Sequence, residues 1–348
     1  MANPTTDSQM YQTLTRQPED LRRVLADGWI PAREAALLIG GTRRIFLTGV
    51  GTSYHAALVG GWLLRAAGRD ARAVLSYDFA TYPESYPLTA DDAVIVMAHS
   101  GVKSFSKLAL DRAVAAGAAV ISVGSRAAEH PGSRLILRTI DRETSAAFTS
   151  SHLCAMTVLA QVADELGVPS LRTHLEALPD QIAGLIDREG QIRPVAERAA
   201  GQKVYAFGGG PSEATALELV IKCREAALHP VDGLAAEQFF HGPIVAANAG
   251  DLAVVVNPHG EASLRTGAIA TAFAEVGGEV WVVGESIPSL PDAPAFRLPI
   301  VPDVLSPLLS VVPIQLFAYH LAAAKGTNPD TFRRDDPTYK DAFALLTL

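Results

Sequence analysis

The sequence predicts an α/β protein with two similar halves, each built around a parallel β-sheet flanked by helices. Short motifs recur about 159 residues apart, and the expected strands are continuous runs of Val, Ile, Leu and Ala. Such strands are buried on both faces, which is typical of parallel sheets that are covered by helices on each side. In each half a glycine turn follows the first of these strands, as expected where a strand passes into a helix.

The internal repeat is visible in three pairs of segments. Each pair combines an apolar strand with a turn rich in glycine, and two of the three pairs have the same spacing. The pairs are 44–53 with 203–212, 92–101 with 251–260, and 116–124 with 276–284. Because the spacing is nearly constant over three strands, we expect the second half to have the same topology as the first.

The distribution of proline and of amphipathic sequence predicts five segments. We expect an N-terminal helical segment, a first α/β subdomain, a helical connector, a second α/β subdomain and a C-terminal tail. Their expected boundaries are 1–38, 39–175, 176–200, 201–326 and 327–348. Residues 304–324 are apolar enough to span a membrane, but prolines and polar residues interrupt them, so we expect a buried core helix.

Composition excludes several classes of protein. Of the 348 residues 49% are hydrophobic, and the formal net charge is −8, which disfavours nucleic-acid binding. The only cysteines, Cys154 and Cys223, are too few for a disulfide scaffold or a thiolate metal site. The polar first residues lack the pattern of a signal peptide. We therefore expect a cytoplasmic protein that binds no membrane, nucleic acid, metal or cofactor.

The turn after the first strand offers groups that could hold a small anion. Gly51 lets a ligand approach the backbone, and Thr52 and Ser53 add hydroxyls at a helix N-terminus. The turn after a neighbouring strand adds Ser100 and Lys103. Two such turns could hold one phosphate, or the hydroxyls could act only as helix caps. The spacing of these glycines does not match a dinucleotide-binding fingerprint.

Three charged residues lie on one face of an otherwise apolar helix in the second half. Glu218, Lys222 and Glu225 are spaced i, i+4 and i+7. Charges are costly on a buried face, so this stripe is either functional or a solvated, salt-bridged surface. A partly desolvated glutamate with a nearby histidine such as His241 would suit acid–base chemistry.

The motifs together resemble a known family. Gly51-Thr-Ser-Tyr-His-Ala (51–56), Ser100-Gly101, the helix 216–225 and His241-Gly-Pro243 are similar to the double sugar-isomerase (SIS) family. In particular they resemble the isomerase half of glutamine:fructose-6-phosphate amidotransferases, over nearly the whole chain. The resemblance implies two tandem SIS subdomains, each a three-layer αβα, flavodoxin-like unit.

The resemblance also implies a site and an activity. It implies a homodimer with a shared active site, no cofactor, and a C-terminal tail that closes the site. Glu225 corresponds to the enolisation base, His241 to the ring-opening histidine and Lys340 to a lysine that engages the sugar carbonyl. The positions implied for the phosphate are Thr52, Ser53, His99 and Ser100, and those implied for the rest of the pocket are Gly51, Glu218 and Lys222.

The chain departs from the family pattern in the first-half anion turn. Ala98 and Lys103 stand where the family has a serine and a threonine, and 143–149 lacks the family's lysine. An inward Lys103 could restore the lost charge, whereas an outward one would face solvent. The isomerase-like part begins near Met1 without a nearby cysteine, so we expect glutamine not to be the nitrogen source.

The expected function is therefore isomerisation, or deamination, of a hexose 6-phosphate or amino-hexose 6-phosphate through an enediol or enolamine. Cleavage of fructosamine 6-phosphates and isomerisation of another 6-anionic sugar, such as a sulfosugar, remain open. From another class of protein, a non-catalytic SIS module that senses a sugar phosphate is the alternative.

Overall fold

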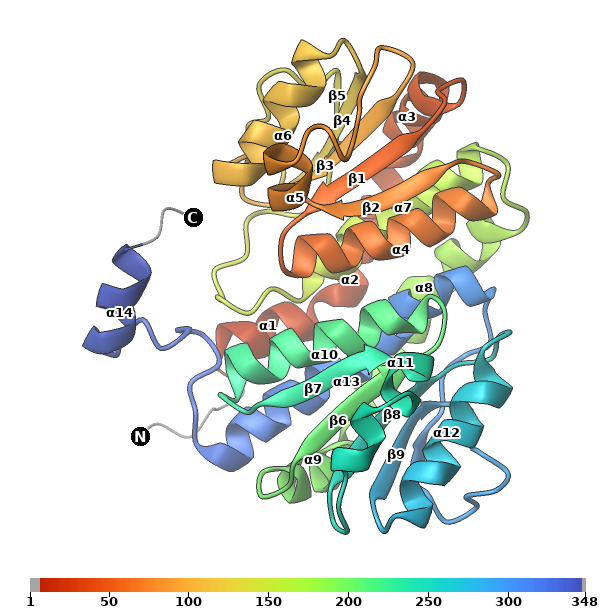
Figure 1. The fold of residues 1–348 in the computed structure, drawn as a ribbon, viewed down its shortest axis with the longest axis vertical. Coiled ribbons are helices and arrows are strands. Elements are labelled where there is room, and N and C mark those ends of the chain that lie inside the picture. Colours follow the sequence, from red (N-terminus) through yellow and green to blue (C-terminus); the bar gives the residue numbers. More distant parts are fainter. Residues whose placement is uncertain (1–6, 346–348) are drawn as a thin grey trace. The chain divides into compact units, whose positions relative to one another are not determined.

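A computed structural model describes residues 7–345 of the protein, which form two compact units (Figure 1). Within the described residues, the N-terminal unit comprises 16–144, 148–179 and 333–345, and the C-terminal unit comprises 7–15, 145–147 and 180–332. Each unit contains one five-stranded sheet. The two units are described separately below.

The sheet of the N-terminal unit has the strand order β2-β1-β3-β4-β5, and all of its strands are parallel. Every residue of β1, β3 and β4 is buried, as expected for continuous apolar strands. The strands are β1 (Ile45–Gly49), β2 (Ala71–Leu75), β3 (Ala93–Met97), β4 (Ala119–Gly124) and β5 (Leu135–Arg138).

Helices cover both faces of this sheet (Figure 1). α3, α4 and α7 lie on one face, and α5 and α6 lie on the other, where Phe79 of α5 packs against Phe46 of β1. The helices are α2 (Gln17–Asp27), α3 (Trp29–Ile39), α4 (Thr52–Ala66), α5 (Ser76–Thr81), α6 (Ser104–Ala115), α7 (Ser150–Glu165) and α14 (Pro337–Ala344). α8 (Leu171–Ile186) contributes residues to both units.

The sheet of the C-terminal unit has the order β10-β9-β8-β6-β7 and is also entirely parallel. Its strands are β6 (Val204–Gly208), β7 (Val231–Ala235), β8 (Leu252–Asn257), β9 (Glu279–Gly284) and β10 (Ala295–Phe296). α10 and α13 pack on one face, and α11 and α12 pack on the other, where Phe207 stacks on Phe239 with ring centroids 4.7 Å apart.

The remaining elements of this unit complete the C-terminal half of the fold. Its helices are α1 (Gln9–Thr15), α9 (Arg193–Ala199), α10 (Ser212–Ala226), α11 (Ala236–Phe240), α12 (Ser263–Glu275) and α13 (Ser306–Lys325). Three short 3₁₀ turns are η1 (Glu189–Gln191), η2 (Pro243–Ala246) and η3 (Asp303–Leu305). The α13 region, Asp303–Lys325, is long and apolar enough to cross a membrane, but 94% of its most apolar window is buried inside the protein.

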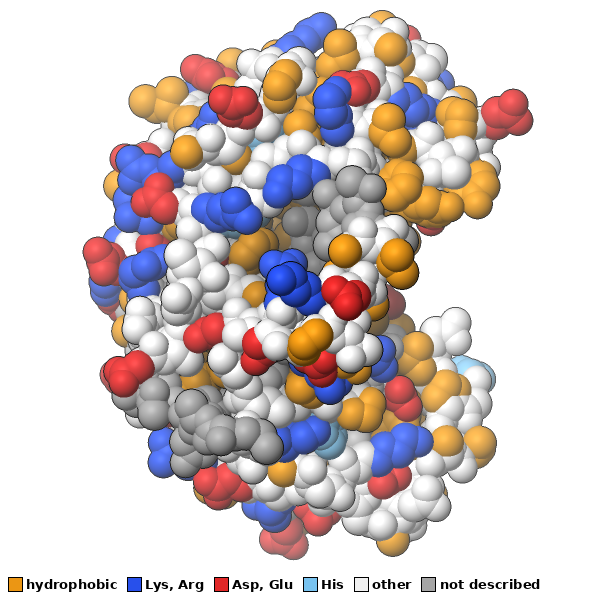
Figure 2. Space-filling model, turned by 90° about the vertical axis from the view of Figure 1, so that its left-hand side faces the viewer, with side chains coloured by type: hydrophobic (Ala, Val, Ile, Leu, Met, Phe, Trp, Pro, Cys, Tyr) orange, Lys and Arg blue, Asp and Glu red, His pale blue; other side chains and the backbone are white. Residues whose placement is uncertain are grey.

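The predicted fold class and repeat are confirmed. β6 begins 159 residues after β1, β8 begins 159 residues after β3, and the strand orders of the two sheets are the same. On the molecular face in Figure 2, basic and acidic side chains are interspersed. In both sheets the strands' carboxyl ends carry the turns that the repeat preserves, and these turns position the candidate site.

Candidate active site

The turn between β1 and α4 opens a helix N-terminus toward a potential ligand. β1 ends at Gly49, where a Cβ atom would lie 2.5 Å from the carbonyl carbon of Ser53, so the close return of the chain requires glycine. Gly51 follows with a positive φ of 58° and no neighbouring atom in the position of a Cβ. α4 then begins at Thr52. The backbone N–H groups of Ser53 and Tyr54 donate to the carbonyls of Val50 and Gly51, and the positive end of the helix dipole at this N-terminus suits an anion.

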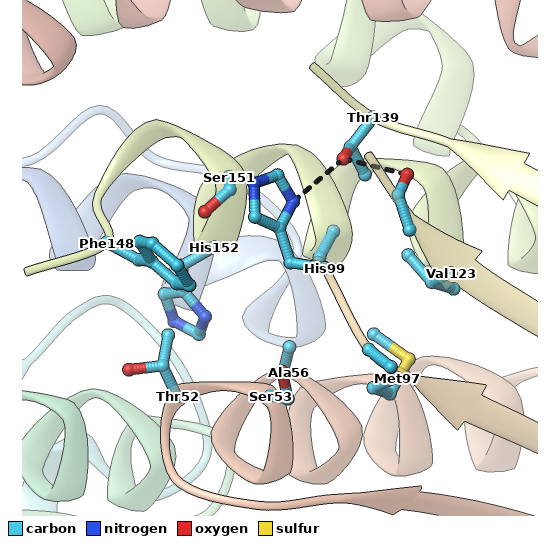
Figure 3. Close-up of a pocket in the computed structure, with 13 residues that line it drawn as sticks. Thr52, Ser53, Ala56, Met97, His99, Val123, Thr139, Phe148, Ser151 and His152 are labelled. Atoms are coloured by element: carbon cyan, nitrogen blue, oxygen red, sulfur yellow. Dashed lines mark hydrogen bonds between the residues drawn. The ribbon is translucent and has the colours of Figure 1, made fainter. Parts of the chain in front are cut away.

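A small cavity lies at this end of the first sheet (Figure 3). Its space for the centre of a water molecule is about 20 Å³, enough for a water molecule or one small polar group rather than a sugar ring. The lining residues come from α4, α7, the ends of β3 and β4, and Thr139 after β5. They are Thr52, Ser53, Ala56, Met97, Ala98, His99, Val123, Gly124, Thr139, Phe148, Ser151, His152 and Ala155.

The imidazole of His99 lines this cavity. The backbone N–H of Glu143 donates to its Nε2 at 3.4 Å, and its Nδ1 lies 3.5 Å from Oγ1 of Thr139, which itself donates to the carbonyl of Gly124. These partners place the ring proton on Nδ1. Burial lowers the pKa of His99 below its usual value, while the nearby Glu143 carboxylate acts in the opposite direction. The ring of Phe148 packs edge-on against the imidazole.

His152 is a cavity residue that the sequence analysis missed. It lies in the first turn of α7, with 4% of its surface exposed, and its ring faces the same space as His99 (Figure 3). The carboxylate of Glu143 caps α7 by accepting backbone N–H groups of Thr149 at 3.1 Å and Ser151 at 2.6 Å. The segment 143–149, which departs from the family pattern, therefore fixes the start of the helix that carries His152.

The other first-half residues of interest lie outside the cavity. Ser100 and Gly51 are partly exposed, and neither belongs to the cavity lining. Lys103 is exposed just before α6, with its backbone N–H bound to Ser106 Oγ at 2.9 Å. The structure thus brings Thr52, Ser53 and His99 together, and it does not add the ammonium of Lys103 to them.

The equivalent cavity of the second sheet differs in charge. It is lined by Ser212, Asn257, Gly260 and Asp303, among others. A Cβ atom at Gly260 would lie 2.5 Å from the carboxylate of Asp303, so this acid lies directly against the turn. Burial raises the pKa of Asp303. A carboxylate in that place disfavours a second anion, so the two halves of the repeat are chemically unequal.

The charged stripe on α10 is buried rather than solvated. The side chains of Glu218 and Lys222 are 0% and 1% exposed, and that of Glu225 is 22% exposed. Lys222 Nζ lies 2.5 Å from the Glu225 carboxylate and 3.5 Å from that of Glu218. A buried ammonium between two carboxylates is compensated, whereas an isolated one would be very costly. Of the two carboxylates, that of Glu225 is the partly accessible one.

His241 and Glu225 lie toward opposite ends of the strands of the second sheet. His241 follows β7 and α11 near the carboxyl ends of the strands, where it is exposed. Its Nε2 lies 3.0 Å from Glu237. α10 begins at Ser212, also near the carboxyl ends of the strands, and runs back along the sheet. Glu225 therefore lies about 20 Å from Ser212 along the helix. Lys340 lies on α14 with an exposed side chain. Thus one C-terminal unit does not bring its own Glu225 and His241 together.

A comparison with known protein families matches the SIS domain at residues 38–164 and again at 199–325, one match over each sheet. The chain belongs to the SIS domain family. Over 333 residues the double SIS chain is 29% identical to the glutamine–fructose-6-phosphate aminotransferase (isomerizing) of Pyrococcus horikoshii, which covers 92% of this chain and 56% of that protein. It therefore spans about half the length of such curated relatives.

Solved structures of low sequence identity share the fold of the double SIS chain. The C-terminal domain of glucosamine-fructose-6-phosphate aminotransferase from Francisella tularensis matches with a TM-score of 0.84 at 17% identity, covering 95% of this chain and all (100%) of that one. A glucosamine-6-phosphate deaminase from Thermotoga maritima matches with a TM-score of 0.75 at 19% identity, covering 93% and 97%. These likenesses show that the double SIS chain has the same fold as these two proteins.

Among residues 7–345 of the double SIS chain, no three His, Cys, Asp or Glu side chains gather in a way that could hold a metal ion. Cys154 and Cys223 are free thiols in the interior, and burial raises the pKa of both. The acid–base groups with a geometry suited to chemistry are therefore carboxylates and imidazoles.

Proposed function

We propose that the double SIS chain isomerises a hexose 6-phosphate or amino-hexose 6-phosphate between aldose and ketose forms, with ammonia released from an amino sugar. The observation that carries the proposal is the Glu225 carboxylate, held 2.5 Å from a buried ammonium on α10. Isomerisation moves a proton between C1 and C2, which requires a carboxylate or a similar base that is ionised yet partly shielded from water. Lys222 forms a direct ion pair with the Glu225 carboxylate.

The proposed reaction assigns one task to each group. The N-terminal unit binds the phosphate through Thr52, Ser53 and His99, and His241 opens the sugar ring. Glu225 then takes the proton from C2 of the open aldose, and the resulting enediol receives it back at C1. With an amino sugar the product is a C2 imine, which water converts to the ketone with release of ammonia. Lys340 is assigned to the sugar carbonyl.

The position of His241 supports a homodimer. Glu225 and His241 lie toward opposite ends of the strands of one sheet, so the same chain would have difficulty presenting both to one sugar. We therefore assign the ring-opening step to His241 of a second copy of the chain, in a cytoplasmic homodimer with a shared site. Isologous pairing of two copies would create two equivalent sites.

The substrate can be identified with a panel of sugars. The protein is incubated in deuterated water with fructose 6-phosphate, glucosamine 6-phosphate, a fructosamine 6-phosphate and a 6-sulfonated hexose. Deuterium at C1 and C2 is followed by NMR, and ammonia or amine release by a coupled assay. Deuterium incorporation with at least one sugar supports catalysis. Saturable binding without any exchange or release would instead favour a module that only senses the sugar.

A further inference from the structure

The first-sheet cavity has no permanent positive charge in its lining. Its 13 lining residues include hydroxyls and two imidazoles but no Lys or Arg. A phosphate ester carries nearly two negative charges at neutral pH. Hydroxyls and the N-terminus of α4 donate hydrogen bonds, but they leave most of this charge uncompensated. The lining groups that could become positive are His99 and His152.

The two imidazoles come from elements far apart in sequence but face one space. His99 follows β3, and His152 lies in the first turn of α7 (Figure 3). His99 is already oriented, since the Glu143 backbone N–H and Thr139 contact its two nitrogens. Glu143 in turn holds the start of α7, so one residue contacts the first imidazole and positions the helix of the second.

Several titratable groups of the described residues lie near the pair. The Glu143 carboxylate favours a protonated His99, and the exposed Arg142 opposes it. Asp20 on α2 accepts a hydrogen bond from Ser150 in the first turn of α7. It also forms ion pairs with Arg16, just before α2, and with Arg23 on α2. Behind the turn that carries His99, burial lowers the pKa of His130 to about 4, so that imidazole stays neutral. His55 of α4 is buried outside the cavity lining.

We infer that His99 and His152 form a histidine pair that becomes charged when an anion enters the cavity, so that the phosphate of the substrate binds together with a proton. The inference rests on the proposed function, because it takes the ligand to be a sugar phosphate. In the free protein burial disfavours the imidazolium form of His99 and lowers its pKa. A bound dianion reverses that preference. His152 thereby becomes a specificity residue that favours doubly charged ligands.

The linkage has a definite sign. Because the bound anion favours the imidazolium forms, affinity is greatest at low pH and falls as the pH rises from acidic to neutral values. For one linked proton the fall approaches tenfold per pH unit. Sulfate is the best probe, because it keeps both charges throughout this range and any pH dependence then belongs to the protein.

Calorimetric titration with sulfate at pH 6 and pH 8, in two buffers of different protonation enthalpy, measures both affinity and proton uptake. We expect tighter binding at pH 6 and net uptake of protons. His99→Asn and His152→Asn should each reduce the uptake and weaken binding mainly at pH 6, whereas His174→Asn on α8 should not. Binding without proton uptake, binding that is equally strong at both pH values, or no sulfate binding at all would overturn the inference.

Two further measurements keep the test independent of folding and of catalysis. If an Asn variant fails to fold, NMR titration of the histidine ring protons in the unaltered protein, with and without sulfate, gives the same answer: two imidazole pKa values must rise on binding. The Glu225→Gln variant should retain proton uptake. Proton uptake without isomerisation would reject only the proposed function, and isomerisation without proton uptake would reject only the histidine pair.

Discussion

The ammonium nitrogen of Lys222 lies 2.5 Å from the carboxylate of Glu225, three residues further along α10. The same ammonium is 3.5 Å from Glu218. Lys222 and Glu218 are inaccessible to water, so solvent does not stabilise their charges. The ion pairs within the cluster compensate for the lost hydration. Burying this cluster costs hydration free energy, and the cluster also positions the carboxylate that we propose as the base.

Removing the ammonium should therefore destabilise the protein strongly. Lys222→Met keeps the volume but removes the buried ammonium that pairs with both carboxylates, so we expect a loss of about 3–5 kcal/mol in the free energy of unfolding. Urea denaturation measures it. The control is Lys107→Met in the exposed Lys107–Asp111 pair, which should change stability by less than about 1 kcal/mol. Equal effects of the two substitutions would contradict a buried cluster.

The cap of α7 provides a second test. Glu143→Gln removes the negative charge that accepts the N–H groups of Thr149 and Ser151, so we expect a loss of about 1–2 kcal/mol. Sulfate affinity should fall as well, because the start of α7 carries His152. Chemical denaturation and calorimetry give the two values, with the exposed Glu129→Gln as the matched control. Unchanged stability would show that the cap does not hold the helix.

The raised pKa of Asp303 predicts how the stability of the folded protein depends on pH. Its pKa is raised in the folded protein, so the folded state keeps this proton to a higher pH than the unfolded chain, and stability is lost as the pH rises from about 3.9 through the folded value. Asp303→Asn removes that loss. It should raise the thermal midpoint at pH 7 more than at pH 4, unlike the exposed Asp292→Asn. A larger gain at pH 4 would reverse the sign and refute the assignment.

The shared site predicts complementation between inactive variants. Glu225→Gln and His241→Ala should each be inactive alone, but a mixed dimer would contain one site with both residues intact. After unfolding and refolding together in equal amounts, about a quarter of the wild-type activity should return if pairing is random. Co-refolding of either variant with itself is the control. No recovery, despite dimers being formed, would place both residues of each site on one chain.

Sequence reasoning predicted the fold because the repeat and the buried strands are local patterns. Continuous apolar runs such as 93–97 read as parallel strands regardless of context, and the structure confirms the resulting sheets. The burial of Lys222 was left open, because periodicity shows which residues share a face but not what covers that face.

No comparable pattern in the sequence indicates a role for His152. A histidine in the first turn of an apolar helix has no signature, and its partner His99 is 53 residues earlier. The end of β3 and the capped start of α7 place the two imidazoles at one cavity. Likewise the orientation of Lys103 depends on the local start of α6, where its backbone binds Ser106.

The central claim is that the Glu225 carboxylate transfers the substrate proton, and solvent exchange tests it most directly. With the accepted sugar phosphate in deuterated water, Glu225→Gln should lower deuterium incorporation at C1 and C2 by about 10²–10⁴-fold, while sugar binding and the folded state persist. The exposed Glu275→Gln on α12 should exchange at the wild-type rate. Exchange by Glu225→Gln at the wild-type rate would contradict the account.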